Sequence, residues 1–213
     1  MKQITFWLDP ISPFAYLAFM RLPEVLQGCS YDVMYRPVLF GALLQHHGQK
    51  GPAEIEPKRA WTFRHTHWLA HQHGIAMDTP LRHPFNPLAL LRLALACAEP
   101  GGTPNRRVVQ MIFDHVWRGH ADASDATRLA ALTAQLAPAR DAQSDAVKAE
   151  LRAHTEAAVA DGIFGVPSFV LDGHVFWGLD SLEMLRAALL GDAWFDGPVW
   201  QREGAPREGL VRR

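Results

Sequence analysis

A strand, a helix and a second strand fill the first 38 residues, and this unit constrains the fold most. Residues 3–8 and 31–38 are β-prone runs, and residues 13–27 between them have the pattern of an amphipathic helix. Parallel strands need a crossover of this kind, whereas antiparallel strands can be joined by a short turn. The sequence therefore predicts an N-terminal β-α-β unit.

The other end of the chain predicts a hairpin followed by a helix. Residues 168–171 and 175–177 are short β-prone runs that flank Asp172-Gly173-His174. The Asp-Gly step is a strong signal for a tight turn between antiparallel strands. A helix over residues 181–190 is expected next.

The chain between these two ends is predicted to be helical. One helix is expected over residues 58–73, after Pro57, and another over residues 87–98, after Asn86. Three more are expected over residues 104–118, 124–136 and 144–160, with start signals at Thr103, at residues 122–124 and at residues 141–144.

The order of these elements is that of an α/β, thioredoxin-like domain interrupted by an all-helical insertion subdomain. Residues 1–38 and 161–200 form the discontinuous thioredoxin-like domain, and residues 39–160 form the insertion. Residues 201–213 are polar and are expected to be a fraying C-terminal tail.

Charge and hydropathy exclude several kinds of partner. Lys and Arg number 21 against 22 Asp and Glu, so the net charge of −1 gives no strong field for nucleic acid or an anionic membrane. No apolar run approaches the roughly 20 residues of a membrane span, and the N-terminus becomes polar too soon for a secretory signal. We expect a cytoplasmic protein that acts on a small molecule.

Neither the cysteines nor the histidines indicate a metal site. Cys29 and Cys97 lie far apart, without C-x-x-C or metal-ligand spacing, and are expected to be small buried hydrophobic residues. His67 and His71 have the i, i+4 spacing of metal ligands, but no matched third ligand follows. We predict no metal.

Ser12 stands where the first predicted helix begins. Serine is a strong N-cap and Pro13 suits the first helical position, so a structural role accounts for both residues. The same helix end offers free N–H groups and a positive dipole, which stabilise an anion such as a thiolate. A hydroxyl at this position can donate to that anion, so both roles stay open.

Val166-Pro167 stands between a glycine-containing turn and a strand. Val166 must be extended because it precedes a proline, and we predict that the peptide bond is cis and faces Ser12. Such a bond leaves the N–H and C=O of Val166 free to pair with an extended peptide, in the manner of an added β-strand. A trans proline at a strand start is the structural alternative.

Asp180 and Ser181 open the last predicted helix. Asp180 with Glu183 three positions later has the outline of a capping box. Alternatively, the helix end and the Ser181 hydroxyl bind a ligand carboxylate, while Asp180 pairs with a ligand ammonium group. An amino acid head group carries both charges.

Several motifs together give a specific resemblance. They are DPISPFAY at residues 9–16, Pro57-Lys58, HPFN at residues 83–86, FGVPSF at residues 164–169 and FWGLD at residues 176–180. In this order the chain resembles the 2-hydroxychromene-2-carboxylate isomerase family, which is related to kappa-class glutathione transferases and more distantly to DsbA-type oxidoreductases. The resemblance covers residues 3–190 and implies an isomerase with glutathione as cofactor.

The resemblance also implies where ligands bind. Glutathione would place its thiol beside Ser12, its cysteinyl backbone against Val166 and Pro167, and its γ-glutamyl end near Asp180 and Ser181. Gln49 and Lys58 stand where family members use an amide and a lysine of the insertion. Asn86 and Phe14 are assigned to the pocket for an aromatic substrate, and a homodimer is expected.

Some positions depart from the family pattern. Gln49 replaces an asparagine, and Ser181 stands where many relatives have arginine. Trp61, His65 and Trp68 stand where tyrosine, aspartate and arginine are common. These departures concern the substrate pocket more than the glutathione site.

The resemblance implies reversible addition of the glutathione thiolate, which would interconvert 2-hydroxychromene-2-carboxylate and trans-o-hydroxybenzylidenepyruvate in aromatic degradation. One alternative is a kappa-like transferase that conjugates glutathione to an electrophile. A second alternative is a non-catalytic thioredoxin-like binding protein. A disulfide oxidoreductase is nearly excluded, because Ser12-Pro13-Phe14-Ala15 has no sulfur where the dithiol should be.

Overall fold

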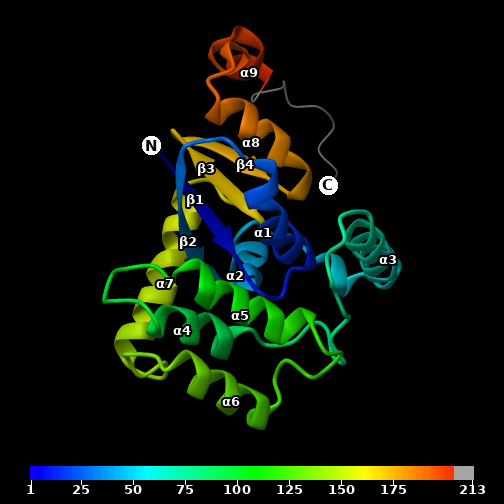
Figure 1. The fold of residues 1–213 in the computed structure, drawn as a ribbon, viewed down its shortest axis with the longest axis vertical. Helices are drawn as coiled ribbons and strands as arrows, with labels where there is room; N and C mark the ends of the chain where they lie inside the picture. The colour runs from blue at the N-terminus through cyan, green and yellow to red at the C-terminus, as the bar shows by residue number, and fades with distance from the viewer. Residues whose placement is uncertain (204–213) are drawn as a thin grey trace.

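The computed structural model describes residues 1–203 and has one four-stranded sheet at its centre (Figure 1). The strands are β1 (Lys2–Leu8), β2 (Tyr31–Pro37), β3 (Ser168–Leu171) and β4 (His174–Trp177), in the order β2-β1-β3-β4. β1 pairs with β2 in parallel and with β3 in antiparallel register. The mixed α/β fold and the N-terminal β-α-β unit are therefore confirmed.

The crossover helix α1 (Pro13–Val25) is buried along most of its length. It ends at Val25, two residues before the predicted end at residue 27. Leu26 already departs from helical geometry, and Gly28 has a φ of 84°. Its aromatic residues Tyr16 and Phe19 are fully buried and contact Phe113. The helix is thus packed between the sheet and the helices that follow β2, which together are called the helical segment below.

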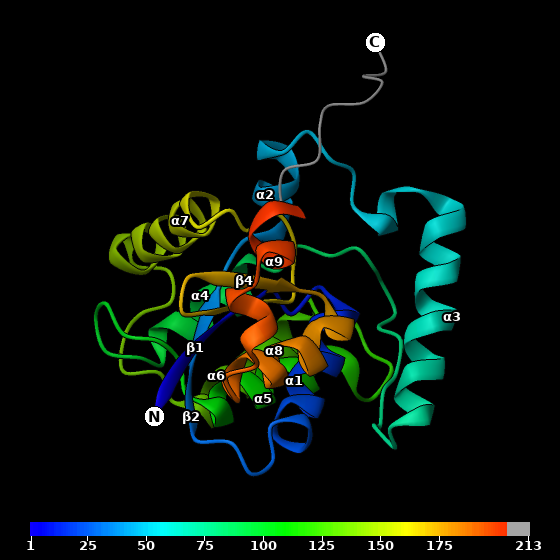
Figure 2. The same cartoon turned by 90° about the horizontal axis from the view of Figure 1, so that it is seen from above.

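Helices alone fill the chain between β2 and β3, as the sequence predicts. They are α2 (Phe40–His46), η1 (Pro52–Glu54), α3 (Glu56–Gln72), α4 (Leu88–Ala96), α5 (Arg106–Trp117), α6 (Ala126–Leu136) and α7 (Asp145–Ala160). α4, α5 and α6 gather at one end of the sheet, whereas α3 lies at the outer side of the molecule (Figures 1 and 2). The division into residues 1–38 with 161–200 and residues 39–160 stays a prediction.

The helix starts correct several expectations. α5 is capped by Asn105 rather than Thr103, and α6 by Asp125 rather than by residues 122–124. Ser144 caps α7, within the predicted start signal. α2 was not predicted from the sequence, because its seven residues follow Leu39, which makes no side-chain cap, and only Leu43 is buried.

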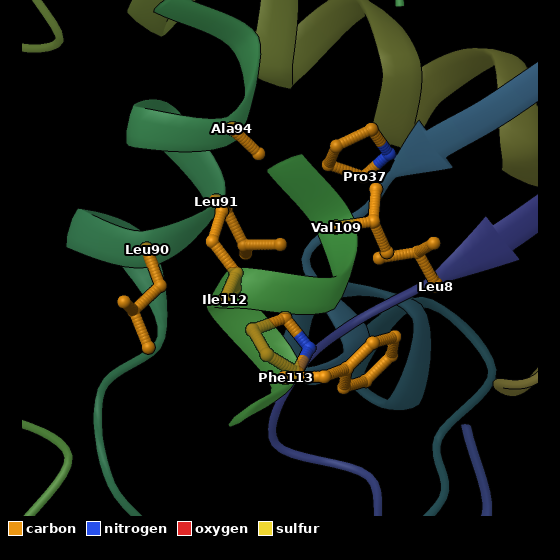
Figure 3. Close-up of a pocket in the computed structure, with 9 residues that line it drawn as sticks. Leu8, Pro37, Leu90, Leu91, Ala94, Val109, Ile112 and Phe113 are labelled. Carbon is orange, nitrogen blue, oxygen red and sulfur yellow. The ribbon is translucent and has the colours of Figure 1, made fainter. Parts of the chain in front are cut away.

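The helical segment packs on the ends of β1 and β2 through apolar side chains. Figure 3 shows residues of α4 and α5 around a void of about 10 Å³. The lining contains no charged residue: Leu8, Pro10, Pro37, Leu90, Leu91, Ala94, Val109, Ile112 and Phe113. A void of this size and chemistry is a packing feature of the core, not a ligand site.

The C-terminal segment begins with the predicted hairpin. Asp172 and Gly173 both have positive φ, 51° and 81°, as a two-residue turn between β3 and β4 requires. The chain continues through η2 (Leu179–Ser181), α8 (Leu182–Leu189), η3 (Ala193–Asp196) and α9 (Pro198–Glu203). The tail expected from residue 201 therefore starts within a helix, and its remaining residues, 204–213, lie outside the described part.

Two further expectations are settled by the fold. Cys29 and Cys97 are free and half-buried and pack against the main hydrophobic core, so the prediction that both are small buried hydrophobic residues is confirmed only in part. Burial raises the pKa of the Cys97 thiol above its usual range. In the described part of the chain, none of the helices combines the length and apolar character that crossing a membrane requires.

Candidate functional site

Ser12 lies at the N-terminus of α1, as predicted. Its Oγ accepts a hydrogen bond from the backbone N–H of Ala15 at 3.2 Å, and Pro13 is the first helical residue. Only 7% of Ser12 is exposed. The capping role is confirmed, and it uses only the lone pairs of the oxygen, so the hydroxyl proton is left for a second partner.

That second partner is Val166. The Ser12 hydroxyl donates to the Val166 carbonyl at 3.2 Å, across 154 residues of sequence. The Val166-Pro167 bond is cis and lies against Ser12, as predicted. Within residues 1–203 no group accepts a hydrogen bond from the Val166 N–H, so this donor stays available beside the serine.

A buried carboxyl group fixes the turn that leads to Ser12. Asp9 is fully buried, and its two oxygens accept hydrogen bonds from the N–H groups of Ile11 and Phe40, both at 3.0 Å. Burial raises the pKa of Asp9 to about 7, and the two backbone hydrogen bonds oppose this effect. The Asp9 side chain therefore connects residues 9–12, called the serine turn below, to the start of α2.

Two side chains from the helical segment hold the same turn. Trp117 donates through Nε1 to the Pro10 carbonyl at 2.9 Å, and His83 bonds through Nε2 to the Ile11 carbonyl at 2.8 Å. A carbonyl only accepts, so Nε2 of His83 carries a proton. Burial lowers the pKa of His83, which favours the neutral ring.

Sequence reasoning did not assign roles to Asp9, His83 and Trp117. Asp9 and His83 lie inside the quoted motifs at residues 9–16 and 83–86, so their place in those motifs was the available signal. Trp117 carries no local signal, because its bond to Pro10 spans 107 residues.

The segment of Asp180 and Ser181 lies next to the cis bond, because the Gly178 N–H donates to the Pro167 carbonyl at 2.9 Å. Ser181 is buried and its hydroxyl donates to the Gly178 carbonyl at 2.8 Å, whereas Asp180 is exposed. The capping box with Glu183 is wrong. η2 winds residues 179–181 as a 3-10 turn, and Ser181 precedes α8 without a side-chain cap.

The glycine before Val166 allows an aromatic side chain to approach the site. A Cβ atom added to Gly165 would lie 2.6 Å from Nε1 of Trp177, so no other residue fits there without displacing the indole. The Trp177 ring also lies 5.0 Å from that of Phe164, and 54% of Trp177 is exposed. The aromatic side chains of Trp177 and Phe164 therefore lie beside the site, next to β4.

No described contact joins Gln49 or Lys58 to this centre. Gln49 and Lys58 are exposed, and no described hydrogen bond or ion pair joins their side chains to the serine turn. The loop that carries Gln49 reaches the site side of the sheet, because His47 Nε2 bonds to the Ile163 carbonyl at 3.2 Å.

The two predicted substrate residues have different surroundings. The ring of Phe14 lies 5.9 Å from that of His65 on α3. Asn86 is exposed, and its side-chain oxygen accepts from the Leu88 N–H at 3.0 Å, so it supports the start of α4. Phe14 joins the serine turn to α3, whereas no described contact joins Asn86 to Ser12.

Potential metal ligands do not cluster in the part of the chain that the structure covers, residues 1–203. His67 instead bonds through Nε2 to the Thr79 hydroxyl at 2.7 Å. What the site offers is a hydroxyl at a helix N-terminus, a free backbone N–H at Val166 and an exposed carboxylate at Asp180. These groups suit a small polar ligand that carries an anion and an amine.

Comparison with known proteins finds that the chain is similar to an isomerase and to a kappa-class glutathione transferase. The chain is 27% identical to the 2-hydroxychromene-2-carboxylate isomerase of Sphingobium xenophagum over 197 residues, covering 89% of this chain and 98% of that protein. It is 25% identical to glutathione S-transferase kappa 1 of Rattus norvegicus over 218 residues, covering 93% and 94%.

A solved structure of a 2-hydroxychromene-2-carboxylate isomerase superposes with a TM-score of 0.77 at 21% identity, over 96% of this chain and all of that one. At this identity the superposition shows a shared fold. The family model described as a DSBA-like thioredoxin domain matches residues 3–190. The chain belongs to the DsbA-like thioredoxin family.

Proposed function

We propose that the protein is a glutathione-dependent isomerase of small aromatic compounds. The reaction would interconvert 2-hydroxychromene-2-carboxylate, the compound in the name of the Sphingobium relative, and trans-o-hydroxybenzylidenepyruvate, the isomer that the family resemblance implies. The observation that carries the proposal is the contact of the Ser12 hydroxyl, at the N-terminus of α1, with the cis Val166-Pro167 bond. Bound glutathione would supply the thiolate that adds to the conjugated carbon and leaves again.

Ser12 would stabilise the bound thiolate. The cap on Ala15 does not use its hydroxyl proton, which has one weak partner, the Val166 carbonyl at 3.2 Å, and can exchange it for a nearby anion. The N-terminus of α1 adds the positive end of the helix dipole at the same place. A free thiol has a pKa of about 8.5, so each unit of lowering stabilises the thiolate by about 1.4 kcal/mol.

Val166 and Asp180 would hold the rest of the cofactor. The free N–H of Val166 would bind an extended peptide carbonyl, and its C=O would accept a peptide N–H once the Ser12 hydroxyl turns away. The exposed Asp180 carboxylate would pair with an ammonium group. Ser181 would take part only by exchanging a bond, because its hydroxyl and its N–H both donate to the Gly178 carbonyl, at 2.8 and 3.3 Å.

Lys58 and Gln49, at the positions where the family resemblance implies a lysine and an amide of the insertion, would contact the bound glutathione. Both side chains are exposed in this structure, so they are free to move toward a ligand. Phe14 and Asn86 are proposed at the substrate end. We also propose a homodimer in the cytoplasm, whose subunit number light scattering would test.

The site does not support dithiol chemistry. The first redox position of the family fold holds Ser12, and Pro13, Phe14 and Ala15 follow it without sulfur. Cys97 has a pKa raised by burial, which disfavours its thiolate. Purified protein with both cysteines replaced should not catalyse insulin reduction, and catalysis by that variant would contradict the proposed role of Ser12.

The second candidate is a kappa-like transferase that conjugates glutathione to an electrophile and releases the product. The similarity to the rat kappa protein over 93% of this chain favours it. Both reactions use the same thiolate site, and they differ only in whether the thiol leaves the product again.

The test is the interconversion of the two isomers by the purified protein, followed by absorbance with and without glutathione. We expect turnover only with glutathione, no net consumption of the thiol, and a large loss of rate in Ser12→Ala. Stoichiometric consumption of glutathione would favour the transferase. Equal turnover without glutathione would reject both candidates.

A further inference from the structure

An exposed aromatic stripe runs along α3 beside the candidate site. Trp61 and Trp68 are 65% and 55% exposed, although tryptophan is usually covered in a folded chain. The His65 ring lies between them, 6.0 Å from Trp61 and 6.3 Å from Trp68, with interplanar angles of 27° and 26°. At 1.5 Å per residue the three side chains span about 10 Å of the helix.

This stripe, Trp61-His65-Trp68, continues from the serine turn. The ring of Phe14, two residues after Ser12, lies 5.9 Å from the His65 ring in an edge contact. The opposite side of α3 is anchored, since Thr66 and Ala70 are buried and Phe63 lies 5.1 Å from His83. His83 in turn bonds to the turn at Ile11, so the stripe is held at a fixed distance from Ser12.

The surroundings of the stripe are positively charged. α3 contains Lys58, Arg59 and Arg64 but only one acid, Glu56. Lys58 and Arg64 are exposed, and no acidic side chain among residues 1–203 forms an ion pair with either. A ligand that covers the stripe would therefore gain from carrying a negative charge.

We propose that the stripe is the specificity surface for the aromatic substrate, and that it favours planar aromatic carboxylates with a fused ring system larger than the single benzene ring of the two isomers named above. One benzene ring covers only one of the three side chains, whereas a fused ring system covers two or more. Phe14 would guide such a ligand from the stripe to Ser12. The inference rests on the proposed function for its reaction, but not for the binding event itself.

The test is calorimetric titration with two unreactive probes, 2-naphthoate and benzoate. In the wild-type protein 2-naphthoate should bind at least about 10-fold more tightly than benzoate, because its second ring can stack on a further aromatic side chain of the stripe. The double variant Trp61→Ala/Trp68→Ala should lose this preference, with 2-naphthoate about 10-fold weaker and benzoate almost unchanged. Trp194→Ala, which removes an exposed tryptophan of η3, is the control and should bind like wild type.

Charge is tested separately with Arg64→Gln. This variant should bind 2-naphthoate about 3-fold more weakly and bind the uncharged 2-naphthalenemethanol like wild type, since a single exposed charge contributes modestly. Equal affinity of both naphthalene probes in wild type would overturn the charge component.

The outcomes separate the stripe from the proposed function. Glutathione affinity is measured in the same variants and should not change. Wild-type affinity for 2-naphthoate that survives in the double variant would overturn the stripe and leave the proposed function standing. A double variant that turns a dimer into a monomer while keeping that affinity would show a subunit interface and also overturn the stripe. If the wild-type protein does not bind glutathione but still prefers 2-naphthoate, the proposed function is rejected and the stripe stands.

Discussion

The Ser12 hydroxyl donates to the carbonyl of Val166, the residue whose backbone is proposed to bind the cofactor. One hydrogen bond therefore occupies two groups that a ligand needs. Binding would exchange it for a bond from Ser12 to the anion and a bond from the ligand to Val166. The exchange leaves no buried polar group without a partner, which keeps its cost small.

The first prediction concerns the two roles of Ser12. Ser12→Ala should raise the pKa of the bound thiol by about 1 to 2, because a hydrogen bond to a charged group contributes about 1.5–3 kcal/mol. It should also lower the free energy of unfolding by about 1 kcal/mol, since the cap on Ala15 is lost. Thiolate absorbance titrations and urea unfolding measure the two effects.

Ser12→Gly separates them. Glycine is a better N-cap than alanine, so this variant should recover part of the stability but none of the thiol effect. Unchanged titration midpoints and rates in both variants would show that Ser12 only caps α1, and that the helix end alone activates the thiol.

The second prediction concerns the buried carboxyl group of Asp9. Its pKa in the folded protein is about 7, above the ordinary value of 3.8. A raised pKa contributes stability that is complete below the unfolded value and is lost as the pH rises through the folded value. Relative to Asp9→Asn, the wild-type protein should therefore lose about 4 kcal/mol of unfolding free energy between pH 4 and pH 8.

Urea unfolding of wild type and Asp9→Asn across this range measures the difference, and the exposed Asp161→Asn is the control. A difference that does not change with pH would mean that Asp9 stays ionised throughout. That result would contradict the dominance of burial over its two backbone hydrogen bonds.

Much of the fold could be predicted because its signals are local. The Asp172-Gly173 turn and the Ser12 cap are each encoded within a few residues, and both are present. A local pattern gave a wrong prediction at the start of the last helix, where the same residues can form either a capping box or a 3-10 turn. Asp180 and Glu183 have capping-box spacing, but residues 179–181 wind as a 3-10 turn and move the start of α8 to Leu182.

The parts of the site that the sequence did not reveal depend on long-range contacts. His83 and Trp117 hold the carbonyls of Ile11 and Pro10 from 72 and 107 residues away. Each side chain has an ordinary local explanation, as part of a loop or of a helix end. Only the packing of the helical segment against the serine turn gives them this role.

The third prediction concerns acid stability. Burial lowers the pKa values of His83, His115 and His154, each of which bonds to a backbone carbonyl. A lowered pKa contributes stability that is present above the unfolded value and lost as the pH falls through the folded value. The unfolding free energy should therefore fall as the pH drops below about 6.5, the ordinary value for histidine.

Because Asp9 acts in the opposite direction over this range, the measurement belongs in the Asp9→Asn background. There, His154→Asn should reduce the slope of the unfolding free energy against pH between pH 5 and 7, because asparagine does not titrate in this range. The asparagine amide can replace the hydrogen bond to the Pro37 carbonyl, which limits the structural effect of the substitution. An unchanged slope would show that His154 does not contribute to the pH dependence.

The fourth prediction concerns Asp180. The side chain is exposed and caps no helix, so Asp180→Ala should change the free energy of unfolding by less than about 0.5 kcal/mol. Glutathione should nevertheless bind about 10-fold more weakly, because a charge-assisted hydrogen bond to its ammonium group contributes about 1.5–3 kcal/mol. Calorimetric titration with glutathione and urea unfolding give the two numbers.

Glu183→Ala is the matched control, since it removes an exposed carboxylate one helical turn away. The control should bind glutathione like wild type. The loss of affinity in Asp180→Ala should also disappear when the ligand lacks the amino group of the γ-glutamyl residue, because the proposed pair then has no cation. Equal weakening by both variants would point to a general effect of negative charge near η2, and an earlier melting point with normal binding in Asp180→Ala would assign the residue a structural role.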